Sequence, residues 1–236
     1  MKLRESTAKE KAEEIDPVTI LLTHMRLECI GVTPNGLMER ISGQYPDEIA
    51  NLYIIKHSSG FTVFMSKNVP LDIRERLKAL PVEMAFVEPE TVKIILGKLY
   101  PKEGPRRGKS YIFPSNLDPK IFPDAVLLSS AHEQLFREFE PDSHFPKHPA
   151  FGIITDNKLV CVCESSKEND EAAESWVRTL EAYRGKGYAK QATLAWAYNL
   201  QQSRKIPFYS HKESNLQSQA VAISLGLIQY SEEVSY

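Results

Sequence analysis

The sequence predicts an α/β protein in which helices flank a central sheet. Three observations support this fold class. Segments with the two-residue period of strands alternate with segments that have the period of helices, above all in the C-terminal half. Clusters of turn residues separate these segments, and the chain contains 15 Pro and 11 Gly. A composition of 42% hydrophobic and 25% charged residues over 236 positions is typical of a globular chain that needs neither a disulfide nor a metal to fold.

Charge and hydropathy argue against several classes of protein. The 29 Lys and Arg residues are balanced by 31 Asp and Glu, so no basic surface for nucleic acid is expected. No apolar run is longer than five residues, whereas a membrane span needs about 18. The first fifteen residues lack the apolar core of a secretory signal, and three cysteines are too few for a disulfide framework. We therefore expect a cytoplasmic protein that binds neither membrane nor nucleic acid.

The N-terminal half is expected to form a smaller α/β domain after a solvated lead-in at residues 1–15. Asp16 followed by Pro17 is typical of a helix start, and apolar residues at helical spacing continue to about Cys29. The further elements expected here are hairpin strands at 52–55 and 61–65, a helix at 72–80, a strand at 83–87 and a helix at 90–99. Residues 101–109 contain two Pro, two Gly and five charges, which predicts a linker. The expected domains are therefore 1–107, of unknown role, and 108–236.

The C-terminal half is expected to alternate strands with helices. Strands are predicted at 110–113, 151–155, 158–164, 175–180, 208–210 and 228–231. Helices are predicted at 131–139, 187–203 and 215–225, with a stiff proline-rich loop at 141–149 and a loose polar connection at 165–173. Cys161 and Cys163 lie two apart on a strand and therefore face one side, where we interpret them as small buried hydrophobic residues.

The glycine-rich turn at residues 184–189 is the strongest functional signal. A strand leads into Gly185 and Gly187, and a helix begins directly after them. The two glycines leave backbone N–H groups unshielded, and the helix start adds its free N–H groups and the positive end of its dipole. Arg184 and Lys186 add mobile positive charge. These features predict a site for an anion the size of a pyrophosphate. The alternative is an ordinary connection between a strand and a helix.

Two familiar glycine motifs do not fit this turn. A dinucleotide fingerprint requires Gly or Ala where the chain has Lys190, and a P-loop requires Gly-Lys-Ser/Thr after a four-residue gap. The turn instead resembles the acyl-CoA-binding motif of the GNAT superfamily of N-acyltransferases, which Arg184, Gly187 and Ala189 match in register. Downstream, Asn215 and the stretch 225–227 also match. The resemblance covers about residues 108–236 and is to a bacterial subgroup of unassigned substrate, with some similarity to glycine N-acyltransferases in Tyr-Arg-Gly-Lys-Gly and Pro-Phe-Tyr.

The resemblance implies a mixed, largely antiparallel central sheet and an N-acyltransferase that uses acetyl-CoA. The acyl group would pass to a primary amine by direct attack in a ternary complex, without a covalent enzyme intermediate and without a metal. The sequence leaves the acceptor and the oligomeric state open. The residues that the resemblance assigns to acyl-CoA are the backbone of Val177 and Thr179, then Arg184, Gly185, Lys186, Gly187, Tyr188, Ala189 and Asn215.

Direct attack requires a general base. Glu171 and Glu174 precede the central strand, and Glu133 lies on a helix, but each has the alternative of being a solvated surface acid. Many members of the family carry a Tyr seven residues after the Asn, and it protonates the leaving CoA sulfur. Here that position is Ala222, with the hydroxyl of Ser218 one turn earlier as a replacement. Ala222 also favours a rival interpretation, a non-catalytic acyl-CoA-binding sensor or partner subunit.

The proline-rich loop carries the candidate contacts to the acceptor amine. These are Asp142, His144 and His148, whose alternative role is to hold the loop itself in place. The two histidines have the i,i+4 spacing of a zinc pair, but Pro146 between them argues against a helix there.

Overall fold

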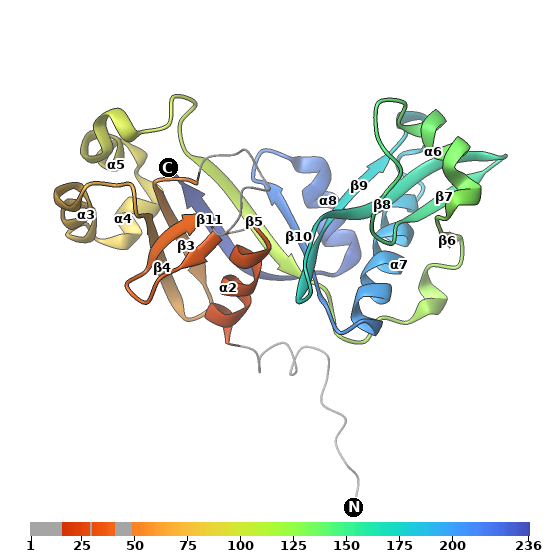
Figure 1. Cartoon of the computed structure of the whole chain (residues 1–236), viewed down its shortest axis with the longest axis horizontal. Helices are drawn as coiled ribbons and strands as arrows, with labels where there is room; N and C mark the ends of the chain where they lie inside the picture. The colour runs from red at the N-terminus through yellow and green to blue at the C-terminus, as the bar shows by residue number, and fades with distance from the viewer. Residues whose placement is uncertain (1–15, 29, 41–48) are drawn as a thin grey trace, which may run out of the picture. The chain divides into compact units, whose positions relative to one another are not determined.

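The computed structural model describes residues 16–28, 30–40 and 49–236, and the chain divides into two compact units (Figure 1). We call residues 111–210 with 217–228 the C-terminal unit. Residues 16–110 with 211–216 and 229–236 form the N-terminal unit, within the described ranges. The expected lead-in at 1–15 lies outside the described residues, as does Cys29. Among the described residues, no helix is both long and apolar enough to cross a membrane.

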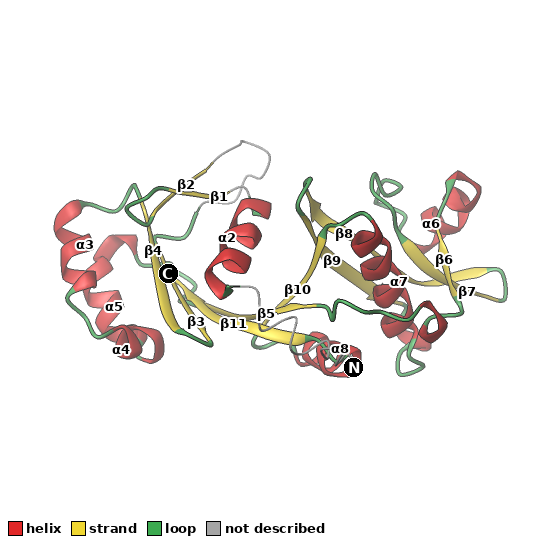
Figure 2. Cartoon of the chain, turned by 90° about the horizontal axis from the view of Figure 1, so that it is seen from below, coloured by secondary structure: helices red, strands yellow, loops and turns green. Residues whose placement is uncertain are grey.

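The N-terminal unit is a five-stranded sheet with helices on both faces, to which the start of β5 (Arg106–Ile112) also belongs. Its strand order is β1-β2-β4-β3-β11, and all of these pairs are antiparallel except β2 with β4. The strands are β1 (Ile30–Val32), β2 (Leu37–Arg40), β3 (Leu52–His57), β4 (Gly60–Ser66) and β11 (Ile228–Ser235). The helices are α2 (Pro17–Leu27), α3 (Leu71–Lys78), α4 (Val82–Val87) and α5 (Pro89–Leu96). Figure 2 shows α2 on one face of this sheet and α3, α4 and α5 on the other, which agrees with a separate apolar cluster on each face.

Two expectations for this unit agree with the structure for local reasons. The carboxylate of Asp16 accepts hydrogen bonds from the backbone N–H groups of Val18 and Thr19, at 3.4 and 3.0 Å, and thereby caps α2. β3 and β4 form the predicted hairpin, and its turn ends at Gly60 with φ of 128°, a backbone conformation that favours glycine.

Two other expectations for this unit are wrong. The segment at 83–87 is a helix and not a strand, because Val82, Ala85 and Phe86 lie at helical spacing and pack against α5 and β3. The predicted linker at 101–109 is a turn followed by strand. The N–H of Gly104 donates to the carbonyl of Pro101 at 3.0 Å, and β5 begins at Arg106.

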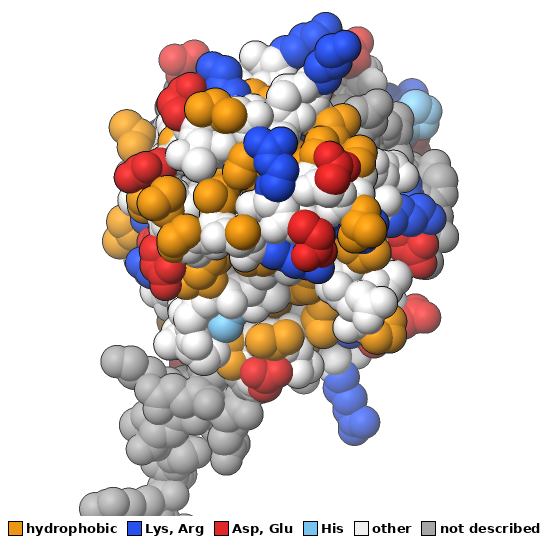
Figure 3. All heavy atoms as spheres, turned by 90° about the vertical axis from the view of Figure 1, so that its left-hand side faces the viewer, with side chains coloured by type: hydrophobic (Ala, Val, Ile, Leu, Met, Phe, Trp, Pro, Cys, Tyr) orange, Lys and Arg blue, Asp and Glu red, His pale blue; other side chains and the backbone are white. Residues whose placement is uncertain are grey.

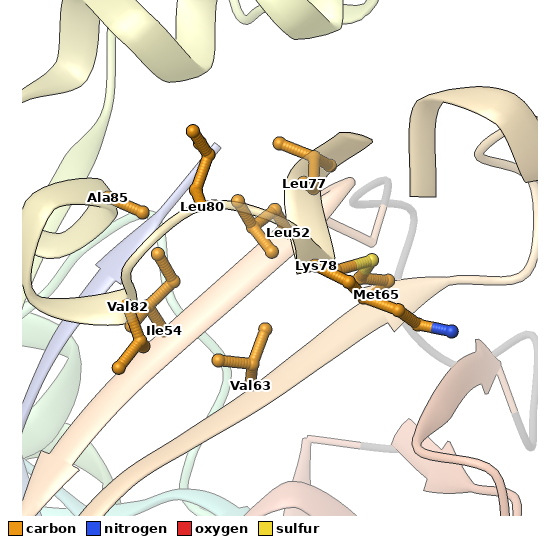
Figure 4. Close-up of a pocket in the computed structure, with 9 residues that line it drawn as sticks. All are labelled: Leu52, Ile54, Val63, Met65, Leu77, Lys78, Leu80, Val82 and Ala85. Carbon is orange, nitrogen blue, oxygen red and sulfur yellow. The ribbon is translucent and has the colours of Figure 1, made fainter. Parts of the chain in front are cut away.

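The core between the sheet and α3 and α4 is incompletely filled. A cavity of about 190 Å³ lies there, lined by apolar side chains and by Lys78 (Figure 4). The ammonium group of Lys78 already forms an exposed ion pair with Glu75 at 3.0 Å. On the helical face of this unit, hydrophobic side chains are scattered among charged ones (Figure 3). Neither feature identifies a ligand.

The C-terminal unit is built on a second run of strands in the order β10-β9-β8-β7-β6. All of these pairs are antiparallel except β9 with β10. The strands are β6 (Ala125–Leu127), β7 (Phe151–Thr155), β8 (Lys158–Glu168), β9 (Ala172–Thr179) and β10 (Ile206–Lys212). The helices are α6 (Glu133–Phe139), α7 (Tyr188–Gln202) and α8 (Leu216–Leu225). The largest apolar cluster joins α7 and α8 to the sheet, and a second cluster joins α6 to it. The predicted mixed and largely antiparallel sheet is confirmed.

The polar run at 165–173 is not the loose connection that we expected. β8 continues to Glu168 and β9 begins at Ala172, so the two strands form one long antiparallel hairpin. Ser165 pairs with Ser175 across the hairpin. The hydroxyl of Ser165 also accepts from the indole N–H of Trp196 on α7 at 3.0 Å. Cys161 and Cys163 are fully buried as expected. Burial raises the pKa of the Cys161 thiol to about 11, which makes it a poor nucleophile at neutral pH.

The two compact units of the structure do not coincide with the predicted domains, 1–107 and 108–236. β11 pairs with β3 over Tyr53 to Lys56, so the last residues of the chain belong to the N-terminal unit. A strand joins the sheet whose backbone groups pair with its own, even when the two strands are far apart in the sequence. The assignment of 1–107 and 108–236 as separate functional domains stays a prediction.

Candidate active site

The glycine turn opens the N-terminus of α7 to an anion. β9 ends at Thr179, and the chain then passes through Gly185 and Gly187, whose φ angles are 77° and 80°. Both angles favour glycine, and a Cβ added at either position would meet nothing within 4 Å. Gly187 is the N-cap of α7, where no side chain caps the helix and no acid stands in the first turn. The first N–H groups of a 15-residue helix are therefore free to bind an anion.

Positive charge surrounds this turn. Arg184, Lys186 and Lys190 are all exposed. The Nε of Arg184 donates to the carbonyl of Thr179 at 3.4 Å, which ties the start of the turn to the end of β9. The ammonium group of Lys186 lies 5.1 Å from the ring centroid of Tyr183. The charge and the free N–H groups together suit a pyrophosphate, so the residues present fit the group that acyl-CoA would place here.

β9 presents an open backbone edge that leads away from this turn. It pairs with β10 over only three residues, from Ala172 to Glu174, and then continues to Thr179. No other described strand pairs with that side of residues 175–179. The free stretch is about 16 Å long at the usual rise per residue of an extended chain.

Register determines which backbone groups point along this open edge. The N–H of Leu180 donates to the carbonyl of Val160 at 2.9 Å, and hydrogen-bonded pairs alternate along an antiparallel ladder. Val177 and Thr179 therefore occupy the pairs that are not hydrogen-bonded to β8. Their N–H and C=O groups point away from β8, toward the open edge. A bound chain with amide groups could form hydrogen bonds to both residues there.

The open edge ends at a junction of polar groups between β9 and β10. Glu174 is 7% exposed, and its carboxylate accepts a hydrogen bond from the hydroxyl of Ser210 on β10. The Nζ of Lys167 lies 3.9 Å from the other carboxylate oxygen. Ser175 faces the opposite side of the strand, and its buried hydroxyl has no hydrogen-bond partner within the described ranges. A buried polar group without a partner is costly, which is consistent with a ligand contact here.

The other proposed catalytic residues differ in their placement. Glu171 is exposed in the turn between β8 and β9, and its backbone carbonyl accepts a hydrogen bond from the N–H of Ile206 at 2.9 Å. Glu133 is half-buried and paired with Arg137 on the same helix. Ser218 is half-buried, whereas Ala222 is only 1% exposed and lies within the apolar cluster of α7 and α8. Only Glu174 among these acids is buried at the edge that β9 leaves open.

Tyr209, the Tyr of the Pro-Phe-Tyr stretch, is a residue of this region to which the sequence analysis assigned no role. It lies on β10 beside the junction, and its hydroxyl donates to the carbonyl of Ser218 in the first turn of α8 at 3.2 Å. Burial raises the pKa of this phenol to about 12. Ser175 and Ser210 were missed as well, because a single serine on a strand carries no periodic or spacing signal.

The proline-rich loop places its three candidates in different surroundings. Asp142 and His144 are exposed. The Nδ1 of His148 lies 3.6 Å from a carboxylate oxygen of Glu168, which also binds Lys205 at 2.7 Å. The ring of Phe145 packs against Phe136 of α6 with centroids 5.4 Å apart. The contact with Glu168 favours a structural role for His148 and leaves Asp142 and His144 accessible.

Asn215 lies in the segment between β10 and α8. It is exposed, and its N–H donates to the carbonyl of Lys212 at 2.9 Å just before α8 begins. It belongs to residues 211–216, which are grouped with the N-terminal unit. The glycine turn belongs to the C-terminal unit, so the structure does not place the two together.

Comparisons with known proteins agree with these features. The model of the GNAT acetyltransferase family matches residues 116–236. A structure described as an acetyltransferase of the GNAT family from Colwellia psychrerythraea has a TM-score of 0.50 at 12% identity, over 87% of this chain and 78% of that one. At that identity the likeness supports the fold alone.

Two further structures give lower scores, and a search of curated proteins gave no match. A GCN5-related N-acetyltransferase-like protein from Streptococcus suis has a TM-score of 0.46 at 15% identity, over 81% of this chain and 87% of that one. A GNAT-family protein from Novosphingobium aromaticivorans has a TM-score of 0.46 at 16% identity. That match covers 56% of this chain and 63% of the other, so this chain spans less than two thirds of that relative.

Proposed function

Because the chain belongs to the GNAT acetyltransferase family, we propose that it transfers an acetyl group from acetyl-CoA to a primary amine. The observation that carries this proposal is the open edge of β9, which joins an uncapped helix N-terminus at one end to a buried carboxylate at the other. A ligand with an anionic end, an amide-containing arm and a reactive group would match these three features in that order.

The first part of the proposal concerns acyl-CoA binding. The N–H groups at Gly187 and in the first turn of α7 bind the pyrophosphate, with Arg184, Gly185, Lys186, Tyr188 and Ala189 forming the rest of the turn. The backbone of Val177 and Thr179 binds the pantetheine arm, because the register directs their N–H and C=O groups away from β8 and toward the open edge. Each charge-assisted hydrogen bond contributes about 1.5–3 kcal/mol. Asn215 stays a candidate from the family pattern.

The second part concerns the chemistry. The amine nitrogen attacks the thioester carbonyl, so a C–N bond forms, the C–S bond breaks and CoA leaves as a thiolate. Glu174 accepts the proton that the amine must lose, directly or through a water molecule. Ser210 holds the Glu174 carboxylate in place, and a backbone N–H group on the open edge of β9 donates to the thioester carbonyl oxygen as negative charge develops there. Holding both substrates together lowers the barrier without a covalent intermediate.

The leaving group can depart without a tyrosine on α8. A thiol has a pKa of about 8.5, so a thiolate is a tolerable leaving group at neutral pH. The carbonyl of Ser218 already engages the Tyr209 phenol, which lies on β10 beside the junction. Water or the hydroxyl of Ser218 can supply the proton that CoA finally takes up.

A paired substitution tests the base. Glu174→Gln keeps the size of the side chain and removes its charge, and we expect kcat to fall by about 10²-fold or more with little change in CoA affinity. Glu171→Gln is the matched control, because that glutamate is exposed three residues away. The assay is thiol release from acetyl-CoA with a panel of primary amines, beside calorimetric CoA binding. Full activity in Glu174→Gln together with lost activity in Glu171→Gln would reverse the assignment.

One observation favours a second function, an acyl-CoA-binding sensor or partner subunit without catalysis. Ala222 is packed into the core, so α8 offers no acidic side chain at the position where many relatives carry a phenol. The same assay separates the two functions. Thiol release with any amine supports the enzyme, whereas tight CoA binding without turnover on the whole panel supports the sensor.

A further inference from the structure

The N-terminal unit contains a polar cavity of about 520 Å³ that the acyl-transfer chemistry does not use. It lies where the start of β3 and the end of β11 meet the segment between α5 and β5 (Figure 1). Most of this segment belongs to the stretch 101–109, for which the sequence predicts a linker. Its volume falls within the range of 300–1,000 Å³ that is typical of sites for small molecules. The residues that define its chemistry are Asn51, Tyr53, Lys98, Lys102, Glu103, Arg106 and Ser235.

Among the described residues, the lining of this cavity carries an excess of positive charge. Lys98, Lys102 and Arg106 line it against a single acidic side chain, Glu103. Within the part of the chain that the structure describes, none of these three cations has an ion-pair partner.

Other lysines of the same unit behave differently. Lys67, Lys78 and Lys93 each pair with a glutamate, at 2.9, 3.0 and 3.5 Å. The surface of this unit therefore balances its lysines with acids in several places but not at the cavity. Like charges gathered in one concave site repel one another unless an anion binds between them.

The walls of the cavity are held in place by hydrogen bonds. The side chain of Asn51 donates to the carbonyl of Leu99 at 2.8 Å, which fixes the segment after α5 against β3. The turn at Pro101 is closed by the N–H of Gly104. Tyr53 and Ser235 lie opposite each other in the pairing of β3 with β11. Burial raises the pKa of Tyr53 well above its ordinary value, so its hydroxyl stays protonated and can donate. The site is preformed and rich in donors.

We propose that this cavity binds a small organic anion that carries at least two negative charges, a phosphate ester or a polycarboxylate. The excess of cations over acids in the lining requires more than one negative charge for neutrality. The volume is larger than a bare inorganic ion needs, and the hydroxyl and amide groups of the lining suit a polar carbon skeleton. This proposal goes beyond acyl transfer and does not depend on it, since the lining residues all belong to the N-terminal unit.

The test uses the full-length chain and compares two triple variants. Lys98→Gln, Lys102→Gln and Arg106→Gln together remove the charge of the cavity. Lys67→Gln, Lys78→Gln and Lys93→Gln together remove the same charge from the same unit outside the cavity. Each protein is titrated with ribose 5-phosphate, citrate, inorganic phosphate and uncharged ribose, with calorimetry for affinity and backbone amide shifts for location. Thermal unfolding tests whether both variants fold. If the cavity triple variant does not fold, the single variant Lys102→Gln replaces it in the titrations.

We expect ribose 5-phosphate or citrate to bind more tightly than phosphate and to shift amides within residues 97–106. The ligand with the higher affinity shows whether the site prefers a phosphate ester or a polycarboxylate. The cavity variant should lose about tenfold or more in affinity, because each exposed charge contact contributes about two- to fivefold. The control variant should bind as the wild type does. Equal loss in both variants, equal binding of uncharged ribose, or shifts confined to the glycine turn at 184–190 would overturn the proposal.

Discussion

Substitution of Gly187 provides the sharpest test of the anion site at α7. Gly187 has φ of 80°, so any other residue there strains the backbone by about 1–2 kcal/mol. A Cβ meets nothing within 4 Å, so neither alanine nor glutamate clashes with the protein itself. Gly187→Ala and Gly187→Glu therefore carry the same backbone strain and differ in the carboxylate.

The expected magnitude follows from what that carboxylate does to a bound pyrophosphate. At about 5 Å and an effective dielectric constant of about 20, two like charges repel by about 3 kcal/mol. The turn is exposed, so screening by water and salt reduces this value. Loss of one charge-assisted hydrogen bond to the helix N-terminus costs a similar amount, about 1.5–3 kcal/mol. We expect Gly187→Glu to weaken CoA binding by about 1–3 kcal/mol, or about fivefold to about 150-fold.

Calorimetry measures CoA affinity, and thermal unfolding measures stability in the same samples. Both variants should lose similar stability, whereas only Gly187→Glu should lose most of its affinity for CoA. The reasoning is refuted if a folded Gly187→Glu protein binds CoA as tightly as Gly187→Ala does.

Three further predictions follow from single residues. Ala222→Tyr should lower the melting temperature and the free energy of unfolding, by about 1–3 kcal/mol, because position 222 is 1% exposed and a larger side chain overpacks the core; unchanged stability with higher kcat would instead put that side chain beside the CoA sulfur. Asp142→Ala or His144→Ala should raise the KM for the amine without changing CoA affinity, and an equal loss of CoA affinity would contradict acceptor binding by this loop. Asp16→Ala should lower thermal stability at neutral pH, because the carboxylate caps α2. Hydrogen bonds from Thr19 lower the pKa of Asp16 in the folded state. Its stabilisation is therefore present above the unfolded pKa and is lost as pH falls through the folded pKa. A difference from wild type that grows at acidic pH would contradict this.

Much of the C-terminal unit could be predicted because its signals are local. The glycines at 185 and 187 adopt the predicted turn because only glycine favours their φ angles. α7 begins at Tyr188 within one residue of its expected start. The β7–β8 hairpin turns through Asp156 and Asn157, both with positive φ, as such residues tolerate. The family pattern of turn, strand and helix is encoded over short stretches of sequence, so the fold class followed from it.

Contacts between residues that are far apart in the sequence determine the features that the sequence did not predict. β11 completes the sheet of the N-terminal unit because its backbone pairs with β3, more than 170 residues earlier, and no period in residues 228–235 specifies that partner. Glu174 looks like any acid before a strand, yet the hydroxyl of Ser210 and burial at the end of the β9–β10 pairing make it the proposed base. In the sequence, Lys102 and Arg106 look like linker charges and Lys98 looks like a charge at the end of a helix. They become a cation cluster only when β3 and β11 close the cavity beside them. Sequence determined local conformation through φ preferences and periodicity, whereas burial and charge partners depend on which distant segments meet, and only the tertiary structure determined those.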